Sequence, residues 1–134
     1  MASFNAALKL QPEFVAARQN LGGELIRMGR DEEAVTQCRL AIADNPYIAE
    51  LHHNLGIALT HLGRLDEAAA AYLNSLRLDP ERAGAYSDLG VVRYQQGRTQ
   101  EAIQLLRTAV RLNPQLKEAS RNLEYLLHEA HAAP

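Results

Sequence analysis

The sequence predicts an all-α fold, a solenoid of stacked helical hairpins, from three observations. Apolar residues make up 47% of the chain, and the strong helix formers Ala and Leu dominate them, while β-branched and aromatic residues are sparse. A set of residues recurs every 34 positions, a period typical of helical repeats. Within each period, Pro and Gly stand where two helices would begin and end.

The 34-residue period appears in several residue types at once. The internal prolines form one series, Pro12, Pro46, Pro80 and Pro114. Leu followed by Gly forms a second series, Leu21-Gly22, Leu55-Gly56 and Leu89-Gly90. Glu followed by Ala forms a third, Glu33-Ala34, Glu67-Ala68 and Glu101-Ala102. Their common register predicts three complete units at 15–48, 49–82 and 83–116.

Each unit is expected to open with one helix, called helix A. An Asn or Asp before the repeated Pro would cap it by accepting a free backbone N–H, and Pro suits the first helical position. These pairs are Asn45-Pro46, Asp79-Pro80 and Asn113-Pro114. Helix A is expected to end just before a glycine that can adopt the left-handed conformation. These glycines are Gly29, Gly63 and Gly97, each followed by Arg.

A second helix, called helix B, is expected after a very short turn, which makes each unit an antiparallel hairpin. Glycine recurs inside helix A, where it costs about 1 kcal/mol relative to Ala, so its recurrence suggests a close contact. We expect helix B to approach helix A there through small residues. The glycines are Gly22, Gly56 and Gly90, and the expected partners are Ala34, Ala68 and Ala102. Large residues would fill the remaining space, among them Leu25, Leu59, Tyr72 and Leu106.

The two ends of the chain differ from the complete units. Residues 1–14 are predicted to be a partial repeat with helix B alone, over 2–11. An uncovered face of that helix could pack on another copy, so a homo-oligomer through 2–11 is one hypothesis. Residues 117–134 are predicted to be a capping helix and a short tail. Glu124 stands where helix A would need Gly, and its carboxylate would resist an incoming helix B.

Together these positions resemble the tetratricopeptide repeat (TPR) family over nearly the whole chain. The middle unit carries the pattern most fully, in Leu55-Gly56, Ala68, Tyr72, Ser75 and Pro80. The resemblance implies a right-handed α-solenoid whose helices A line a concave groove. Arg18 and His52 stand where the family usually has an aromatic in helix A, and Cys38 and Leu106 replace the aromatic of helix B. These departures alter packing detail and leave the fold prediction unchanged.

A partner is expected in that groove. Register within the repeat assigns the following residues to it: Gln19, Asn20, Arg27, His53, Asn54, Ile57, His61, Asp88, Val91, Tyr94, Arg121, Asn122 and Tyr125. One series among them again has a spacing of 34, namely Asn20, Asn54, Asp88 and Asn122.

This series resembles the asparagine ladder that lines the superhelix of O-linked N-acetylglucosamine transferases, where the amides hold the backbone of an extended peptide. An amide both donates and accepts, so it can hold a peptide group without demanding a particular side chain. The alternative is that these side chains tie neighbouring repeats together. Asp88 departs from the amide pattern and could favour a basic or donor-rich ligand.

The carboxylate clamp, by which some members of the family grip chaperone tails, is not expected. That clamp uses a set of Lys, Arg and Asn side chains. Its positions would hold Gln19, Gly23, Asn54, Gly84 and Asp88, of which one fits. The register one repeat later gives His53, Ile57, Asp88, Glu118 and Asn122, which fits no better.

The leading hypothesis is therefore a protein-interaction scaffold that binds an extended peptide. A substrate-recruiting portion of a larger enzyme, such as a glycosyltransferase, and a self-assembling scaffold are the alternatives. No catalytic residue, cofactor or metal is predicted, since His53 and His61 are too far apart for a metal pair and Cys38 fits a core position. A net charge of −2 without a basic run argues against nucleic acid. No apolar run approaches the ~20 residues of a membrane span, and a cytoplasmic location is expected.

Overall fold

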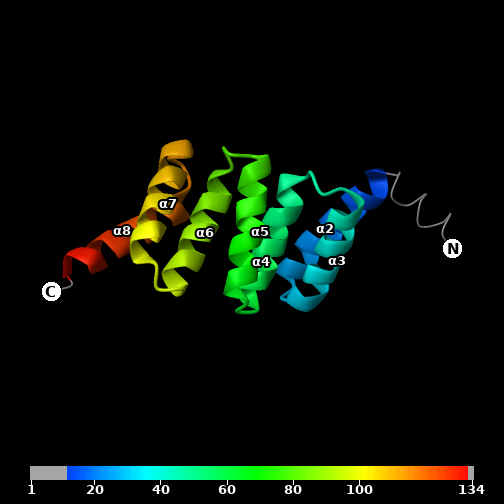
Figure 1. Cartoon of the computed structure of the whole chain (residues 1–134), viewed down its shortest axis with the longest axis horizontal. Coiled ribbons are helices and arrows are strands. Elements are labelled where there is room, and N and C mark those ends of the chain that lie inside the picture. Colours follow the sequence, from blue (N-terminus) through cyan, green and yellow to red (C-terminus); the bar gives the residue numbers. More distant parts are fainter. Residues whose placement is uncertain (1–11, 133–134) are drawn as a thin grey trace.

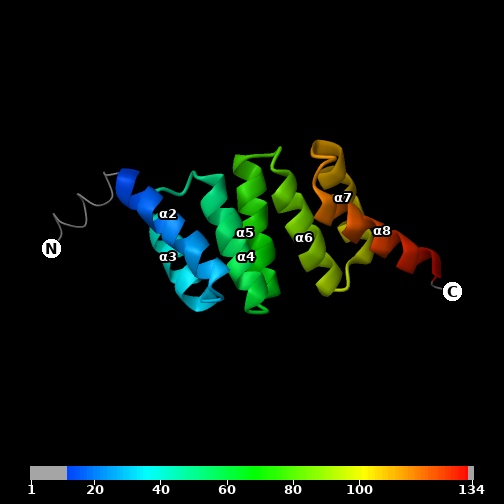
Figure 2. The same cartoon turned by 180° about the vertical axis from the view of Figure 1, so that it is seen from behind.

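Seven α-helices lie side by side along one long axis in the part of the chain that the computed structural model describes, residues 12–132 (Figures 1 and 2). They are α2 (Pro12–Arg27), α3 (Asp31–Asp44), α4 (Ala49–His61), α5 (Leu65–Leu78), α6 (Ala83–Gln95), α7 (Thr99–Leu112) and α8 (Lys117–Ala132). Within these residues no strand occurs, which confirms the all-α prediction. The helix expected over 2–11 lies outside the described residues.

The helices pair as three hairpins, α2 with α3, α4 with α5, and α6 with α7. Each hairpin packs on the next through its second helix, so α3 contacts α4, α5 contacts α6 and α7 contacts α8. The first helices also touch one another, α2 with α4, α4 with α6 and α6 with α8. The backbones of α3 and α5, and those of α5 and α7, approach one another less closely within 12–132. The layer of α2, α4, α6 and α8 is thus the closer-packed one, which places it on the inner side of a curved array.

The turn inside each hairpin forms as predicted. Gly29 has a φ of 75°, and Gly63 and Gly97 have 76° and 81°. In the first hairpin the N–H of Gly29 donates to the carbonyl of Ile26 at 3.0 Å, and the N–H of Arg30 donates to that of Leu25 at 2.8 Å. This pair of bonds is the Schellman motif, which satisfies the last carbonyls of helix A and reverses the chain in very few residues.

The predicted start of helix A at the Asn/Asp-Pro pairs is wrong for α4, α6 and α8. Asn45, Asp79 and Asn113 instead form the C-caps of α3, α5 and α7. Their side-chain oxygens accept the backbone N–H two residues further on; Asn45 Oδ1, for example, accepts from Tyr47 at 3.1 Å. A residue before Pro is driven out of the helical region, so helix B stops there and an Asx turn carries the chain into α4 at Ala49. Only α2 begins with its proline, Pro12.

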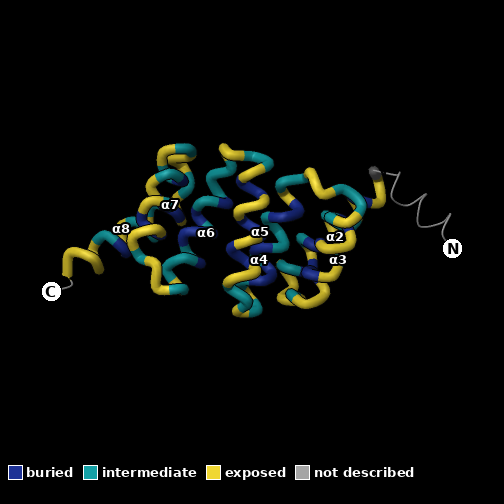
Figure 3. The backbone as a smooth tube through the Cα atoms, viewed as in Figure 1, coloured by how far each residue is buried: buried dark blue, intermediate teal, exposed yellow. Residues whose placement is uncertain are grey.

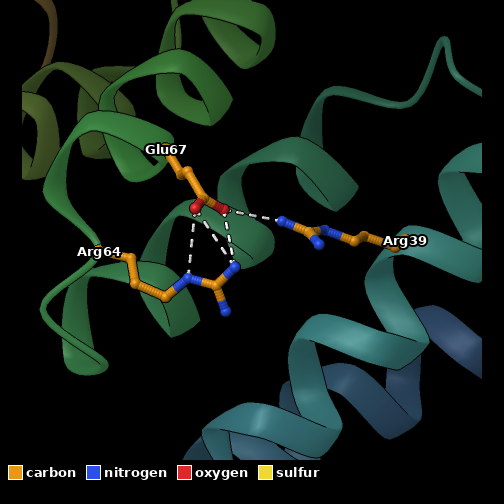
Figure 4. A network of polar contacts seen from close by, with 3 residues as sticks. All are labelled: Arg39, Arg64 and Glu67. Atoms are coloured by element: carbon orange, nitrogen blue, oxygen red, sulfur yellow. Dashed lines mark hydrogen bonds and ion pairs between the residues drawn. The ribbon is translucent and has the colours of Figure 1, made fainter.

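Helix B begins at an Arg–Glu pair in every hairpin. Arg30, Arg64 and Arg98 precede the first helical residue, and each contacts a Glu three positions later, such as Arg64 with Glu67 at 3.0 Å. Figure 4 shows that Glu67 also accepts from Arg39 of α3, at 2.9 Å, so the pair links two hairpins. These side chains are about half exposed, and such pairs contribute roughly 0–1 kcal/mol.

The nearest neighbour of the helix A glycine is a larger residue, one helical turn beyond the predicted alanine. A Cβ on Gly56 would lie 2.5 Å from Cε1 of Tyr72, and one on Gly22 would lie 3.1 Å from Sγ of Cys38. Ala34, Ala68 and Ala102 are fully buried, and a Cβ on Gly90 would lie 3.0 Å from Cγ of Leu106 and 3.4 Å from the carbonyl oxygen of Ala102. Side chains on a helix point back toward its N-terminus, over the preceding turn. The side chain four positions after each alanine, Cys38, Tyr72 or Leu106, therefore reaches back over that alanine and contacts the glycine of helix A.

Gly56→Ala is expected to destabilise the protein although Ala is the better helix former. The added methyl would overlap the buried ring of Tyr72, and overpacking of this kind costs about 1–3 kcal/mol, more than the ~1 kcal/mol gained in helix propensity. The control is Gly23→Ala in α2, whose new Cβ would meet only Arg27 Nη1, at 3.9 Å. Urea denaturation should show Gly23→Ala more stable than the parent, and equal gains in both variants would contradict the contact.

Buried residues lie where the helices face one another (Figure 3). The large residues expected in the core are buried as predicted, Leu25, Leu59, Tyr72 and Leu106. Cys38 is also buried, and burial raises the pKa of its thiol to about 11, which keeps it neutral and confirms its core role.

The two departures from the family pattern in helix A are accommodated by polar partners. Arg18 Nη1 donates to Asp44 Oδ2 at 2.8 Å, which joins α2 to the end of α3. His52 is buried, and its Nε2 lies 2.9 Å from the carbonyl oxygen of Pro46. Both substitutions are therefore compatible with a packed hairpin.

Candidate functional site

Three hollows follow one another along the inner layer. The first, of about 260 Å³ between α2 and α4, is lined by Gln19, Asn20, Gly23, Glu24, Arg27, Glu50 and Asn54. The central one, of about 400 Å³, is lined by Ile57, Thr60, His61, Tyr72, Asp88, Val91 and Glu118. The third, of about 160 Å³ between α6 and α8, is lined by Val91, Tyr94, Leu106, Asn122, Tyr125 and Leu126. Because Val91 lines both the second and the third, these two are adjacent. We call the three together the inner groove.

Most of the residues that the sequence assigned to a groove lie in these hollows, brought together from four helices. They are Gln19, Asn20, Arg27, Asn54, Ile57, His61, Asp88, Val91, Tyr94, Asn122 and Tyr125. His53 and Arg121 line none of the three hollows. Peptide contact by the eleven residues in the hollows stays a prediction, since their position shows only that they share one surface.

His53 ties two hairpins together. Arg82 Nε donates to His53 Nδ1 at 2.9 Å, and because Arg can only donate, Nδ1 must be the acceptor. His53 Nε2 therefore carries the hydrogen that it shares with Asp88 Oδ2, at 2.7 Å. The ring also meets Tyr72 edge to face, with centroids 5.7 Å apart, and the side chain is 13% exposed. His53 thus joins α4 to the start of α6 and lies outside the three hollows, so its contact with a peptide stays a prediction.

The predicted ladder divides into two kinds of residue. The Asp88 carboxylate accepts a hydrogen bond from His53 and so joins α6 to α4. Asp88 thus fits the alternative hypothesis that the ladder side chains tie neighbouring repeats together. Within residues 12–132, the amides of Asn20, Asn54 and Asn122 form no hydrogen bond. Asn20 is exposed and the other two are half-buried. Three amides thus keep their donors and acceptors available along the groove.

Two aromatic side chains, Tyr94 and Tyr125, lie together at the α8 end of the groove. The Tyr94 hydroxyl donates to the Glu129 carboxylate at 3.0 Å, and this hydrogen bond raises the pKa of Tyr94 to about 12. The Tyr94 and Tyr125 rings meet edge to face with centroids 6.4 Å apart. Tyr125 is largely exposed, so it offers an aromatic face to a ligand.

The charge of the groove changes along its length. In the first hollow Glu24 pairs with Arg27, and Gln19 Nε2 donates to Glu50 at 2.6 Å. In the central hollow, the described lining holds the carboxylates of Asp88 and Glu118 without any Lys or Arg. The third hollow is mainly apolar and aromatic. The middle of the groove is therefore acidic.

Within residues 12–132, no three His, Cys, Asp or Glu side chains lie close enough together to hold a metal ion. No helix in this range has both the length and the apolar character needed to cross a bilayer.

The helical hairpins, their period and the groove along the first helices define a helical-repeat protein. The family model described as tetratricopeptide repeat matches residues 53–117. The chain belongs to the tetratricopeptide repeat family, and its residues 3–78 also match the model described as bacterial transcriptional activator domain. A comparison with curated proteins gave no significant match.

Solved structures with the same fold are themselves TPR domains. The first TPR of Spaghetti (RPAP3), bound to an HSP90 peptide, is 19% identical with a TM-score of 0.86, over 93% of this chain and 99% of that one. The second TPR domain of human RPAP3, in complex with an HSP70 peptide, is 25% identical with a TM-score of 0.80, over 87% and 98%. YrrB, a TPR protein with an unusual peptide-binding site, is 23% identical with a TM-score of 0.77, over 82% and 57%.

Proposed function

We propose that this chain is a protein-interaction scaffold that binds an extended segment of a partner protein along the inner groove. The observation that carries this proposal is a row of three amides, Asn20, Asn54 and Asn122, that line the first and third hollows and have no hydrogen-bond partner within residues 12–132. An extended peptide leaves many main-chain N–H and C=O groups unpaired, and amide side chains can satisfy both kinds. No catalytic step is proposed.

The comparisons support a peptide as the ligand class. The second TPR domain of human RPAP3 is in complex with a peptide of HSP70, and the first TPR of Spaghetti is bound to the HSP90 peptide SRMEEVD. The groove of this chain differs in charge from what such an acidic tail requires. Its central hollow holds Asp88 and Glu118, and the positions of the carboxylate clamp hold Gln19, Gly23, Asn54, Gly84 and Asp88, none of them basic. A different class of peptide is therefore proposed.

The groove would accept many peptide sequences but select particular side chains at a few positions. Amide contacts to the main chain accept many sequences, whereas the hollows at Ile57 and at Tyr94 with Tyr125 would take particular side chains. Aromatic side chains in a partly enclosed hollow are the usual anchors of such interfaces. We expect a few anchor residues of the partner to dominate the affinity.

The double substitution Asn54→Ala with Asn122→Ala should weaken peptide binding about tenfold, because each amide hydrogen bond contributes about 0.5–1.5 kcal/mol. The probe is a fluorescent synthetic peptide taken from a displayed random 12-residue library panned on the parent protein, and fluorescence anisotropy gives the Kd. The melting temperature should stay unchanged, since neither amide has a partner in the described structure.

Asn74→Ala is the matched control, because Asn74 is exposed on α5 and lines none of the three hollows. It should alter neither binding nor melting. A double variant that binds the probe as tightly as the parent contradicts the proposal. A double variant that melts well below the parent would show that the amides hold the repeats together.

The match to the bacterial transcriptional activator domain suggests a second context. The same groove would then recruit a partner protein to a regulator of transcription, with any DNA contact made by another part of that protein. A DNA-binding domain encoded in the same reading frame would support this context. The enzyme-recruitment alternative stays a sequence prediction. The homo-oligomer hypothesis concerns 2–11, which lies outside the described residues.

A further inference from the structure

The polar side chains that line the central hollow of the inner groove present hydrogen-bond acceptors. Thr60 Oγ1 donates to the carbonyl of Gly56 at 2.7 Å, so at its 3.3 Å contact with Tyr72 the tyrosine hydroxyl must donate. The oxygen of Tyr72, a residue only 1% exposed, is left with acceptor capacity at this hollow. His61 Nδ1 lies 2.9 Å from Asp31 Oδ1, which leaves the Nε2 of a neutral His61 ring as an acceptor too.

The two carboxylates of this hollow are incompletely paired. Asp88 uses Oδ2 for His53, and its Oδ1 has no partner within residues 12–132. Glu118 forms no ion pair and no side-chain hydrogen bond in the same range. Burial and, after it, the nearby charge of Asp88 raise the pKa of the Tyr72 hydroxyl, and both residues line the hollow. No Arg or Lys of the described lining offsets these charges.

The walls of the hollow are apolar. Ile57 of α4 and Val91 of α6 line it together with the acceptor groups. Long basic side chains bury their methylene stems on apolar surface and keep the charged end near polar partners. The combination of apolar walls, several acceptors and two carboxylates is complementary to such a side chain in shape and in charge.

We propose that the central hollow binds a Lys or Arg side chain of the extended peptide. This inference rests on the proposed function and names the chemistry of its ligand. The third hollow shares Val91 with the central one and is lined by Tyr94, Tyr125 and Leu126, so it takes a bulky apolar side chain. Alternate residues of an extended chain point the same way, so the basic and the apolar residue stand two positions apart in the ligand.

The test is a selection of displayed random 12-residue peptides on the parent protein. Peptides that bind through the groove are those that lose affinity for the variant with Asn54→Ala and Asn122→Ala. We expect these peptides to be enriched in Lys or Arg at one position, with a large apolar residue two positions away. The affinity of these peptides, measured by fluorescence anisotropy, should fall as the salt concentration is raised, since the contact is ionic.

Two substitutions that remove a negative charge test whether the basic peptide side chain contacts Asp88 and Glu118. Glu118→Gln should weaken the selected peptide about threefold, as expected for an exposed ion pair. Asp88→Asn should weaken it about tenfold, because Asp88 is more enclosed. Asn keeps an oxygen for His53, so the tie between α4 and α6 is retained. Glu124→Gln is the matched control, since Glu124 is exposed on the same helix as Glu118 but lines none of the three hollows.

The outcomes separate the two proposals. Groove-dependent peptides without an excess of basic residues, or with affinities that Glu118→Gln and Asp88→Asn leave unchanged, overturn the basic-residue site and leave the scaffold proposal standing. A selection that yields no groove-dependent peptide overturns both.

Discussion

Tyr72→Ala is expected to produce the largest loss of stability, about 3–5 kcal/mol, which is the range for removing a buried aromatic side chain. Tyr72 is 1% exposed and lies at the centre of the array. Its ring covers Gly56, meets His53 edge to face and forms the floor of the central hollow. Removal of the ring leaves a cavity between α4 and α5, so the middle hairpin should lose its packing.

Urea denaturation followed by circular dichroism measures this loss, and Tyr47→Ala is the control. Tyr47 is 77% exposed in the turn between α3 and α4, so its truncation should change the free energy of unfolding by less than about 0.5 kcal/mol. A repeat array is held by contacts between neighbours, so a damaged middle hairpin should also broaden the unfolding transition. Equal stability of the two variants would show that Tyr72 is not the centre of the core.

Ala68→Leu is expected to have the next largest effect. Ala68 is 0% exposed in α5, and the added carbon atoms have no space unless α4 and α5 move apart. Overpacking of a filled core costs about 1–3 kcal/mol. The same movement would displace Tyr72 and so deform the central hollow, so affinity for a selected peptide should fall together with the melting temperature.

Ala70→Leu separates packing from helix propensity, because Ala70 is exposed on the same helix. It introduces the same residue and should leave both the melting temperature and peptide binding nearly unchanged. Differential scanning calorimetry of the two variants gives the comparison. An Ala68→Leu variant that melts with the parent would refute the close packing of the hairpin at this residue.

The local rules of the sequence predicted the hairpins but not the start of every helix. Gly29 reverses the chain as expected, because a residue with φ near 75° is unfavourable for any side chain larger than hydrogen. Asn45-Pro46 was ambiguous, since the same side-chain oxygen can cap a following helix or close an Asx turn. Because Pro46 drives Asn45 out of the helical region, α3 ends there, the Asx turn forms and α4 starts only at Ala49.

The candidate site shows the same division. Register in the repeat placed Asn54 and Tyr94 on the inner layer, because residues at equivalent positions of stacked hairpins face the same way. It also assigned His53 to the groove, but Arg82 and Asp88 hold its ring between two hairpins. These partners are 29 and 35 residues away, a separation at which sequence alone does not indicate contact.

By itself, the sequence determined the all-α class, the 34-residue period, the hairpin turns and the set of residues on the inner layer, because these follow from periodicity and from the backbone preferences of Gly and Pro. Only the tertiary structure decided which larger side chain meets each glycine, which ladder residues remain unpaired, and that Asp88 and Glu118 share one hollow. The physical reason is that a hollow is the space left between helices of different hairpins, and its size and charge depend on how those helices pack.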